Sequence, residues 1–257
     1  MEQWEADRIL YAKNLQSCIK SIYMHIGGFQ KNSLIDFPKT LACIIFTQGC
    51  NFICPYCHNP DLVESPQKKA GKLFDAAKIL DFLDQRKNLM EGVVITGGEP
   101  TLQKDLAAFC LKIKQLGYRI KLDTNGTRPQ VLEYLLDHQL IDFVSMDIKT
   151  SPDHYHGVVS ERFDTRKIET SIGLLMSGPL EYEFRTTCTK PFITEEIMDE
   201  IGKLIKGAKS YILQKCSRNI KALDLEFLKE DHHFFSDAKM EQLKHIISPY
   251  VEAVVVR

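Results

Sequence analysis

The sequence lacks an excess of either charge: 33 Lys and Arg residues stand against 34 Asp and Glu residues, and the formal net charge is −1. Proteins that bind nucleic acids or acidic membrane surfaces usually carry a strong positive field, so we expect neither of these partners. The sequence also lacks any apolar run near the ~18 residues that a membrane-spanning helix needs. These two absences favour a soluble globular protein.

A secretory signal is also missing from the first residues, because Glu2, Glu5 and Asp7 interrupt the apolar stretch that such a signal requires. We therefore expect a cytoplasmic protein. Roughly helical spacing of apolar residues predicts that residues 1–24 form an N-terminal helical arm or extension. Residues 25–257 are then expected to form the core domain.

Low-complexity tracts and long linkers are absent, and strand-like segments alternate with helix-like segments. The predicted strands cover residues 41–47, 92–96, 118–123, 141–148, 181–188 and 211–215, with a further strand at 251–256, and the predicted helices cover 74–89, 105–116, 129–138, 166–176, 195–205 and 238–247. This alternation predicts the α/β class, with a parallel sheet covered by helices in a single domain. Six such units can close partly into a barrel or form an open, doubly wound sheet, and periodicity does not separate the two.

Cysteines cluster in one place. The sequence contains eight, and Cys50, Cys54 and Cys57 share one short loop with the spacing CxxxCxxC. A disulfide framework would be denser and typical of a smaller secreted protein, so the cluster indicates a metal or redox site. The scattered cysteines are interpreted as ordinary thiols: Cys18, Cys43, Cys110, Cys188 and Cys216.

Three interpretations of the cysteine loop are open. A structural zinc site would need His58 as its fourth ligand, and His58 adjoins Cys57, which is an awkward spacing for a tetrahedron. A chance cluster of buried cysteines is disfavoured because the loop is polar. We favour a [4Fe–4S] cluster with three protein ligands and one iron left open for a further ligand.

Polar motifs also follow other predicted strands, at the ends where parallel α/β folds place their active sites. Taken alone, each has a plain structural interpretation: a tight turn, an Asn-Gly turn, a surface ion pair or an internal salt bridge. The motifs are Gly97-Gly98-Glu99-Pro100, Asp123-Thr124-Asn125-Gly126 and Asp147 with Lys149, and to them we add Arg185, which lies in the middle of the predicted strand 181–188.

The spacing CxxxCxΦC, with Tyr56 as the aromatic residue, resembles the signature of the radical S-adenosylmethionine (SAM) superfamily. The longer segment 46–60, FTQGCNFICPYCHNP, resembles the glycyl-radical-enzyme activating enzymes. Segment 33–38, SLIDFP, resembles the opening of anaerobic ribonucleoside-triphosphate reductase activating proteins. The fold that this resemblance implies is a partial (β/α)6 TIM-type barrel.

The resemblance implies a [4Fe–4S] cluster on the three cysteines and SAM bound to its open iron. The GGEP motif, with Gly97, Gly98 and Glu99, would bind the amino group of SAM. Arg185 would bind its carboxylate.

Further cofactor contacts are implied by the resemblance. Asp123 and Thr124 are associated with a monovalent cation, Asp147 lies near it, and Asn125 lies beside the cofactor. The remaining cofactor contacts that we expect are Lys149, Tyr56 and His58.

The activity implied is reductive cleavage of SAM and formation of a glycyl radical on a partner enzyme, most specifically anaerobic ribonucleotide reductase, with flavodoxin or ferredoxin as electron donor. Three alternatives stay open: activation of another glycyl-radical enzyme of the pyruvate formate-lyase type, a radical SAM enzyme acting on a small molecule, and a non-catalytic zinc-binding module. Residues 58–109 contain no cysteine, so the ferredoxin-like insert of some activators is absent. Gln214 resembles a glutamine of the ribonucleotide reductase type, whereas His232 and His233 lie too far along the sequence to assign.

Overall fold

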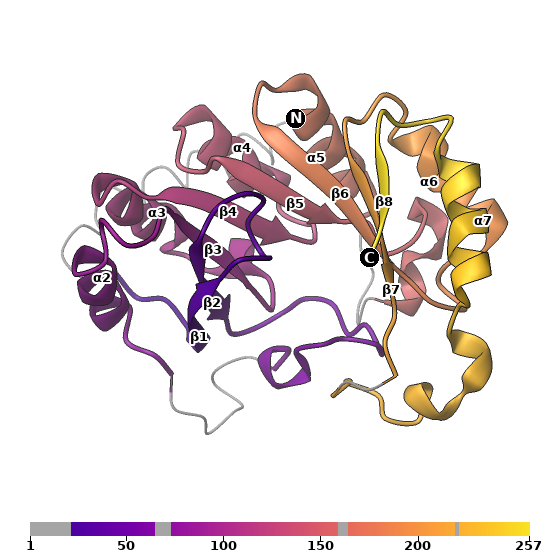
Figure 1. Ribbon diagram of the computed structural model, residues 1–257, viewed down its shortest axis with the longest axis horizontal. Helices are drawn as coiled ribbons and strands as arrows, with labels where there is room; N and C mark the ends of the chain where they lie inside the picture. Colours follow the sequence, from indigo (N-terminus) through magenta and orange to yellow (C-terminus); the bar gives the residue numbers. More distant parts are fainter. Residues whose placement is uncertain (1–21, 65–72, 159–163, 219–220) are drawn as a thin grey trace. The chain divides into compact units, whose positions relative to one another are not determined.

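A computed structural model describes residues 22–64, 73–158, 164–218 and 221–257. The arm predicted over residues 1–24 and Cys18 therefore lie outside the described residues, apart from the last three positions of the arm. The strands form one sheet in chain order from β1 to β8 (Figure 1). The chain divides into two compact units, and each is described below by itself. Unit 1 contains the described parts of Met1–Cys50, Glu64–Thr124 and Arg128–Val144, and unit 2 contains those of Asn51–Val63, Asn125–Thr127 and Ser145–Arg257.

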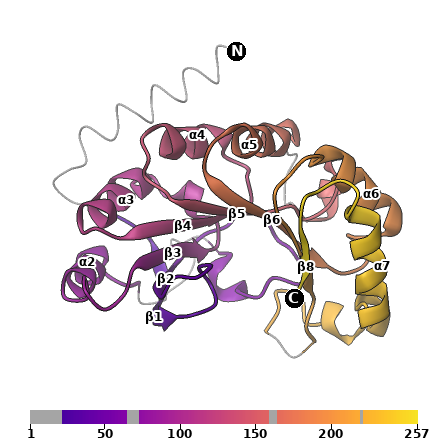
Figure 2. The same ribbon diagram turned by 45° about the horizontal axis from the view of Figure 1, so that its top comes forward.

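Unit 1 is built on parallel strands. Strands β2 (Ala42–Thr47), β3 (Gly92–Gly97) and β4 (Arg119–Thr124) pair in this order, with Thr47 opposite Gly97. Their carboxyl ends therefore lie at one edge. Helices α2, α3 and α4 line the outside of these strands (Figure 2). Their bounds are Ala76–Asp84, Leu106–Gln115 and Pro129–Asp137.

Strand β1 (Ile26–Ser33) pairs antiparallel with β2 and is a strand that the sequence did not predict. Its segment, IGGFQKNS, has two glycines and no apolar alternation, and most of its residues are exposed or half-buried. It is a strand because it satisfies the hydrogen-bonding edge of β2, and an edge strand of this kind leaves little periodic signal.

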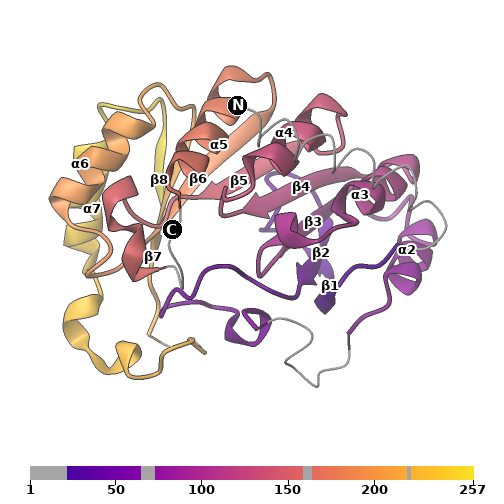
Figure 3. The same ribbon diagram turned by 180° about the vertical axis from the view of Figure 1, so that it is seen from behind.

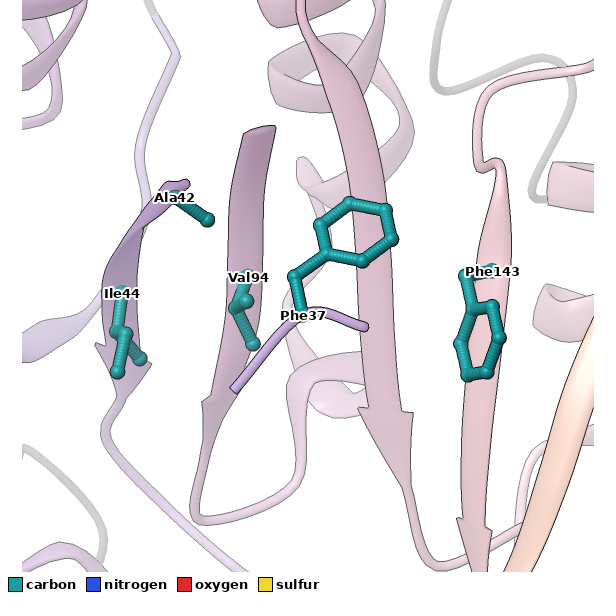
Figure 4. Packing of buried hydrophobic residues seen from close by; sticks show 5 residues of the cluster. All are labelled: Phe37, Ala42, Ile44, Val94 and Phe143. Carbon is teal, nitrogen blue, oxygen red and sulfur yellow. The ribbon is translucent and has the colours of Figure 1, made fainter. Parts of the chain in front are cut away.

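An apolar cluster closes the inner face of unit 1. Phe37, Ala42, Ile44, Val94 and Phe143 pack together there, on the face turned away from the helices (Figure 4). The rings of Phe37 and Phe143 lie 6.1 Å apart at a tilt, a favourable aromatic geometry. The continuous apolar runs of β2 and β3 thus fill both faces of the sheet, as expected of a parallel sheet.

Unit 2 contains a second parallel set, β6 (Glu181–Cys188), β7 (Tyr211–Lys215) and β8 (Val254–Val256). Strand β5 (Phe143–Asp147) begins in unit 1 and ends in unit 2. Helices α6 and α7 pack against each other, and α7 also contacts β7 and β8 (Figure 3). The helices of this unit are α5 (Arg166–Ser177), α6 (Glu195–Leu204) and α7 (Asp237–Ile247).

The α/β class and the six predicted strand–helix units are confirmed. Helix α2 is shorter than predicted, because it ends at Asp84 and the chain turns over the next residues. Leu89, which continued the apolar pattern in the sequence, is 62% exposed and contributes nothing to the core.

Candidate functional site

The cysteine loop begins directly after β2 and is fixed by backbone hydrogen bonds. The N–H of Cys57 donates to the carbonyl of Cys54 at 3.0 Å, which closes a turn around Pro55 and Tyr56. The N–H of Asp224 donates to the carbonyl of Pro55, also at 3.0 Å. A segment far along the chain therefore holds this turn, and Cys54 and Cys57 are placed together within unit 2.

The three thiols differ in exposure: Cys54 is buried, and Cys50 and Cys57 are half-buried. Burial raises the pKa of Cys54 to about 11, and the neighbouring Lys149 ammonium opposes that shift. Burial also raises the pKa of Cys57. Thiols of this kind carry their protons until a metal ion displaces them, which is how cysteine becomes a metal ligand.

A carboxylate between two cations lies beside this loop in unit 2. The Asp147 carboxylate accepts a hydrogen bond from Arg185 Nε at 2.8 Å and one from Lys149 Nζ at 3.0 Å. Burial alone would raise the pKa of Asp147, but the two positive charges outweigh it and hold that pKa well below its ordinary value. The charge of Lys149 acts on Cys54, Cys57 and His58, so the sequence-predicted Asp147, Lys149 and Arg185 do gather near the cysteines.

The plain structural interpretation of Arg185 was an internal salt bridge. The structure contains that salt bridge, and its partner is Asp147. The backbone also ties the end of β5 to the middle of β6, because the N–H of Ile148 donates to the carbonyl of Arg185 at 2.8 Å. A role for Arg185 toward the SAM carboxylate stays a prediction.

Glu99 is buried in unit 1 rather than solvated, with 1% of its surface exposed. Its Oε1 accepts hydrogen bonds from the main-chain N–H of Thr101 at 3.0 Å and from the hydroxyl of Thr124 at 2.8 Å. Its own N–H donates to the carbonyl of Gly49, next to Cys50, at 2.8 Å. Three sequence-predicted segments, the cysteine loop, GGEP and DTNG, therefore meet at Glu99 within unit 1, the first through its main-chain N–H and the last through its carboxylate.

Position 97 requires a glycine, because the backbone of strand β2 passes close to it. Its φ is +119°, and a Cβ there would lie 2.4 Å from the main-chain N and 2.6 Å from the main-chain O of Thr47. We expected the GGEP glycines to let a ligand approach the backbone. At Gly97 the approaching group is the chain itself.

A ring of three polar side chains, which we call the amide ring, links the cysteine loop to the DTNG turn within unit 2. Asn125 Nδ2 donates to Asn51 Oδ1 at 2.9 Å, and Asn51 Nδ2 donates to Thr127 Oγ1 at 2.9 Å. The hydroxyl of Thr127 donates to Asn125 Oδ1 at 2.7 Å and closes the ring. Asn51 and Thr127 were not singled out in the sequence, although Asn51 directly follows Cys50.

Lys121 is a third residue that was not singled out in the sequence. It is 2% exposed, and its ammonium donates to the carboxylate of Asp123 on the same strand. The signal was present in YRIKLD, because residues two apart on a strand share a face. From the sequence alone, Lys121 and Asp123 would be interpreted as two solvent-exposed residues, because the burial of β4 is known only from the structure.

Tyr56 lies in an aromatic cluster of unit 2. Its ring centroid lies 5.4 Å from that of Phe192 and 6.2 Å from that of Phe227, and His233 stacks on Phe227 at 4.0 Å. The fold thus brings His233 near the cysteine loop, which its sequence position did not indicate. Gln214 lies on β7 opposite Thr187.

The hydroxyl of Tyr56 is buried and, within the part of the chain that the structure describes, has no hydrogen-bond partner. A buried polar atom without a partner is costly, and a bound ligand is one explanation for it. Three thiols in one loop are also a suitable donor set for an iron–sulfur cluster. The residues present therefore fit the two cofactors that the resemblance implies.

Among the described residues, no three His, Cys, Asp or Glu side chains lie close enough together to hold a metal ion. That Cys50, Cys54 and Cys57 hold a cluster stays a prediction from their spacing and chemistry.

The sequence profile of the Radical SAM superfamily matches residues 44–176. SuiB from Streptococcus suis, solved with its precursor peptide SuiA, aligns with a TM-score of 0.60 at 15% identity over 83% of this chain and 48% of that one. The structure described as "Native anSMEcpe with bound AdoMet" aligns with a TM-score of 0.50 at 19% identity, over 72% of this chain and 53% of that one. The chain spans about half the length of these two structures, and at this identity they show the fold alone. The protein is a radical SAM enzyme, which uses a [4Fe–4S] cluster and SAM.

A closer relationship comes from a relative in Methanocaldococcus jannaschii, named "Putative glycyl-radical enzyme activating enzyme MJ1227". It is 34% identical over 90% of this chain and 95% of its own length. Within the radical SAM superfamily, the chain therefore belongs to the family of glycyl-radical-enzyme activating enzymes.

A pyruvate formate-lyase-activating enzyme from Clostridium pasteurianum is 33% identical over 50% of this chain and 53% of its own length. In the described part of the chain, no helix is long and apolar enough to cross a membrane.

Proposed function

We propose that this chain activates a glycyl-radical enzyme, and that its target is anaerobic ribonucleotide reductase. The observation that carries the proposal is the arrangement in unit 2, where Cys54 and Cys57 lie beside the charged group of Asp147, Lys149 and Arg185. A cluster with an open iron needs a polar cradle for its ligand, and this group supplies charges of both signs. The name of the M. jannaschii relative supports the activating role.

In this proposal each part of the site has a task. The thiolates of Cys50, Cys54 and Cys57 hold the cluster. Glu99 and the backbone of Gly97 and Gly98 receive the ammonium of SAM, because a buried carboxylate is the natural partner of a cation.

The opposite end of SAM carries a carboxylate. Arg185 and Lys149 offer it positive charge, and Asp147 keeps both cations in place while SAM is absent. Tyr56 and His58 flank Cys57, and Tyr56 has a buried hydroxyl available to a ligand. Asn125, through the amide ring, holds the loop.

Held by the three cysteines, such a cluster would supply one electron for reductive cleavage of the S–C5′ bond of SAM to methionine and a 5′-deoxyadenosyl radical, and that radical would take a hydrogen atom from a glycine Cα of the partner. This chain contributes binding and orientation, and no general base is needed. The reductant is a low-potential donor such as flavodoxin or ferredoxin, and the place of action is the cytoplasm. We also propose that residues 25–257 act as one catalytic core.

A specific observation favours a second target. The chain also matches pyruvate formate-lyase-activating enzymes, including one from Streptococcus mutans at 34% identity over 49% of this chain. The matched part is only half of each protein. We still rank anaerobic ribonucleotide reductase as the first target, because segment 33–38 resembles the opening of its activating proteins.

The test is anaerobic. The full chain is reconstituted with iron and sulfide, reduced with dithionite and mixed with SAM and a purified partner, and the glycyl radical is measured by electron paramagnetic resonance. A radical on anaerobic ribonucleotide reductase but not on pyruvate formate-lyase supports the first target. The reverse result supports the second, and a radical on neither partner, with SAM still cleaved, contradicts both.

Variants connect this test with the cysteines. Cys54→Ala is expected to abolish SAM cleavage and to lower the bound iron, whereas Cys110→Ala, which removes a buried thiol of helix α3, should retain both. Full SAM cleavage by Cys54→Ala would contradict the cluster assignment.

A further inference from the structure

Strand β4 carries a lysine that is as buried as the core around it. Lys121 is 2% exposed, and its ammonium donates to the carboxylate of Asp123, whose side chain is 15% exposed. A buried ammonium without a partner is strongly unfavourable, because its hydration is lost and nothing replaces it. The pair is therefore an obligatory one for Lys121.

The register of the sheet shows where this ammonium begins. Lys121 lies opposite Val94 on the neighbouring strand β3, and Val94 belongs to the apolar cluster with Phe37 and Phe143 (Figure 4). The side chain of Lys121 therefore starts on the inner face of unit 1, the face of the apolar cluster. Lys121 lies three residues before Thr124, the last residue of β4. From there its long stem reaches toward Asp123, at the edge where β2, β3 and β4 end.

The resemblance implies a monovalent metal cation at Asp123 and Thr124, with Asp147 near it. The residues present do not fit such an ion. Asp123 already has the Lys121 ammonium on its carboxylate, and the Thr124 hydroxyl donates to Glu99 at 2.8 Å. Asp147, in unit 2, already pairs with both Arg185 and Lys149.

The charges already present at Asp123 and Asp147 also oppose the binding of a metal cation. Each of the two aspartates carries one negative charge, and each is matched or exceeded by positive side chains of its own unit. A sodium or potassium ion on Asp123 would bring a second positive charge close to the Lys121 ammonium, in surroundings where repulsion is poorly screened. The bound metal would have to displace the buried ammonium of Lys121, whose ion-pair partner among the described residues is Asp123.

We propose that Lys121 supplies, from within the chain, the positive charge that the resemblance assigns to a bound monovalent cation at Asp123. The protein then folds and binds SAM without sodium or potassium. The negative charge at Asp123 is neutralised permanently, independent of the salt in the surroundings.

The experiment compares chloride salts of potassium, sodium and choline at equal ionic strength, using the full chain. The first measurement is the thermal unfolding midpoint without cluster, and the second is the SAM affinity of the reconstituted protein by anaerobic calorimetry. For the wild type, both are expected to be the same in the three salts. A midpoint that rises saturably with potassium or sodium but not with choline, and loses this response in Asp123→Asn, would overturn the proposal.

Lys121→Met keeps the length of the stem and removes the charge. This variant is expected to become responsive to salt identity, with a higher midpoint in potassium or sodium than in choline, while Lys121→Arg should stay unresponsive. Lys104→Met, at an exposed lysine of the same unit, is the matched control. A Lys121→Met protein that folds and remains indifferent to the cation would contradict the proposal.

If Lys121→Met does not fold, the double variant Lys121→Met with Asp123→Asn removes both charges and should fold in choline. The wild-type midpoints alone also decide the question, since they need no variant. They involve neither a partner enzyme nor a radical, so their outcome is independent of whether the proposed activation is correct.

Discussion

Arg185 Nε lies 2.8 Å from Asp147 Oδ1, an ion pair that joins the end of strand β5 to strand β6 within unit 2. The other oxygen of Asp147 accepts from Lys149 at 3.0 Å. One carboxylate thus holds two cations next to the cysteine loop. The electrostatics of this part of the site depend on Asp147.

Replacing Asp147 by Asn is expected to lower the free energy of unfolding by about 2–3 kcal/mol. Two cations then lose their counter-charge, and the effect is smaller than for a fully buried pair because Asp147 is 24% and Arg185 14% exposed. The measurement is urea unfolding of the cluster-free protein at neutral pH. Asp153→Asn, at an exposed position, should change stability by less than about 0.5 kcal/mol.

The same pair predicts a pH dependence. The folded pKa of Asp147 is depressed below its ordinary value of 3.8, so its stabilisation is fully present above that value and is lost as the pH falls through the folded pKa. The stability difference between wild type and Asp147→Asn should therefore be constant from about pH 5 to 7 and shrink below about pH 4. A difference that grows toward acid would contradict this assignment.

Asn51→Ala is expected to open the amide ring and to loosen the start of the cysteine loop. It removes one donor and one acceptor from two buried partners, Asn125 and Thr127, at a cost of about 1–3 kcal/mol. Iron incorporation during reconstitution should slow, because the loop samples more conformations before the cluster forms.

Iron per chain and the urea midpoint check this prediction together. Asn32→Ala, at an exposed asparagine, is the control and should load iron as the wild type does. Normal iron loading by a destabilised Asn51→Ala would show that the amide ring serves only the fold.

Tyr56→Phe separates two roles of one hydroxyl. That hydroxyl has no partner among the described residues, so its removal should leave the unfolding free energy of the cluster-free protein unchanged or raise it by up to about 1 kcal/mol. If a ligand group bonds to it, SAM affinity should fall by about fivefold or more. Calorimetry of the reconstituted variant provides the test, and an unchanged affinity would assign Tyr56 to packing alone.

Gly97→Ala is expected to cost about 3 kcal/mol or more, because the new Cβ would clash with the backbone of Thr47 in addition to the strain of a positive φ. Gly117→Ala is the matched control: its φ is +91°, but nothing lies within 4 Å of the added atom. That variant should cost only about 1 kcal/mol, the price of the backbone conformation. Equal losses of stability for the two would show that the contact with Thr47 yields easily.

Strands β2 to β7 could be predicted from the sequence because buried parallel strands are continuous apolar runs between helices. The cysteine loop could be predicted because all three thiols lie within eight residues. Strand β1 could not, since its residues carry no periodic pattern and its strand state comes from the free edge of β2.

By itself, the sequence determined the class of fold and placed three thiols in one loop, because both depend on local spacing. It also indicated that the polar motifs lie at strand ends, because parallel strands end at one edge. Only the tertiary structure decided which charges meet. It paired Arg185 with Asp147, buried Lys121 against Asp123 and stacked His233 near Tyr56, because burial and long-range contacts, not spacing along the chain, determine the partners of a charged or aromatic side chain.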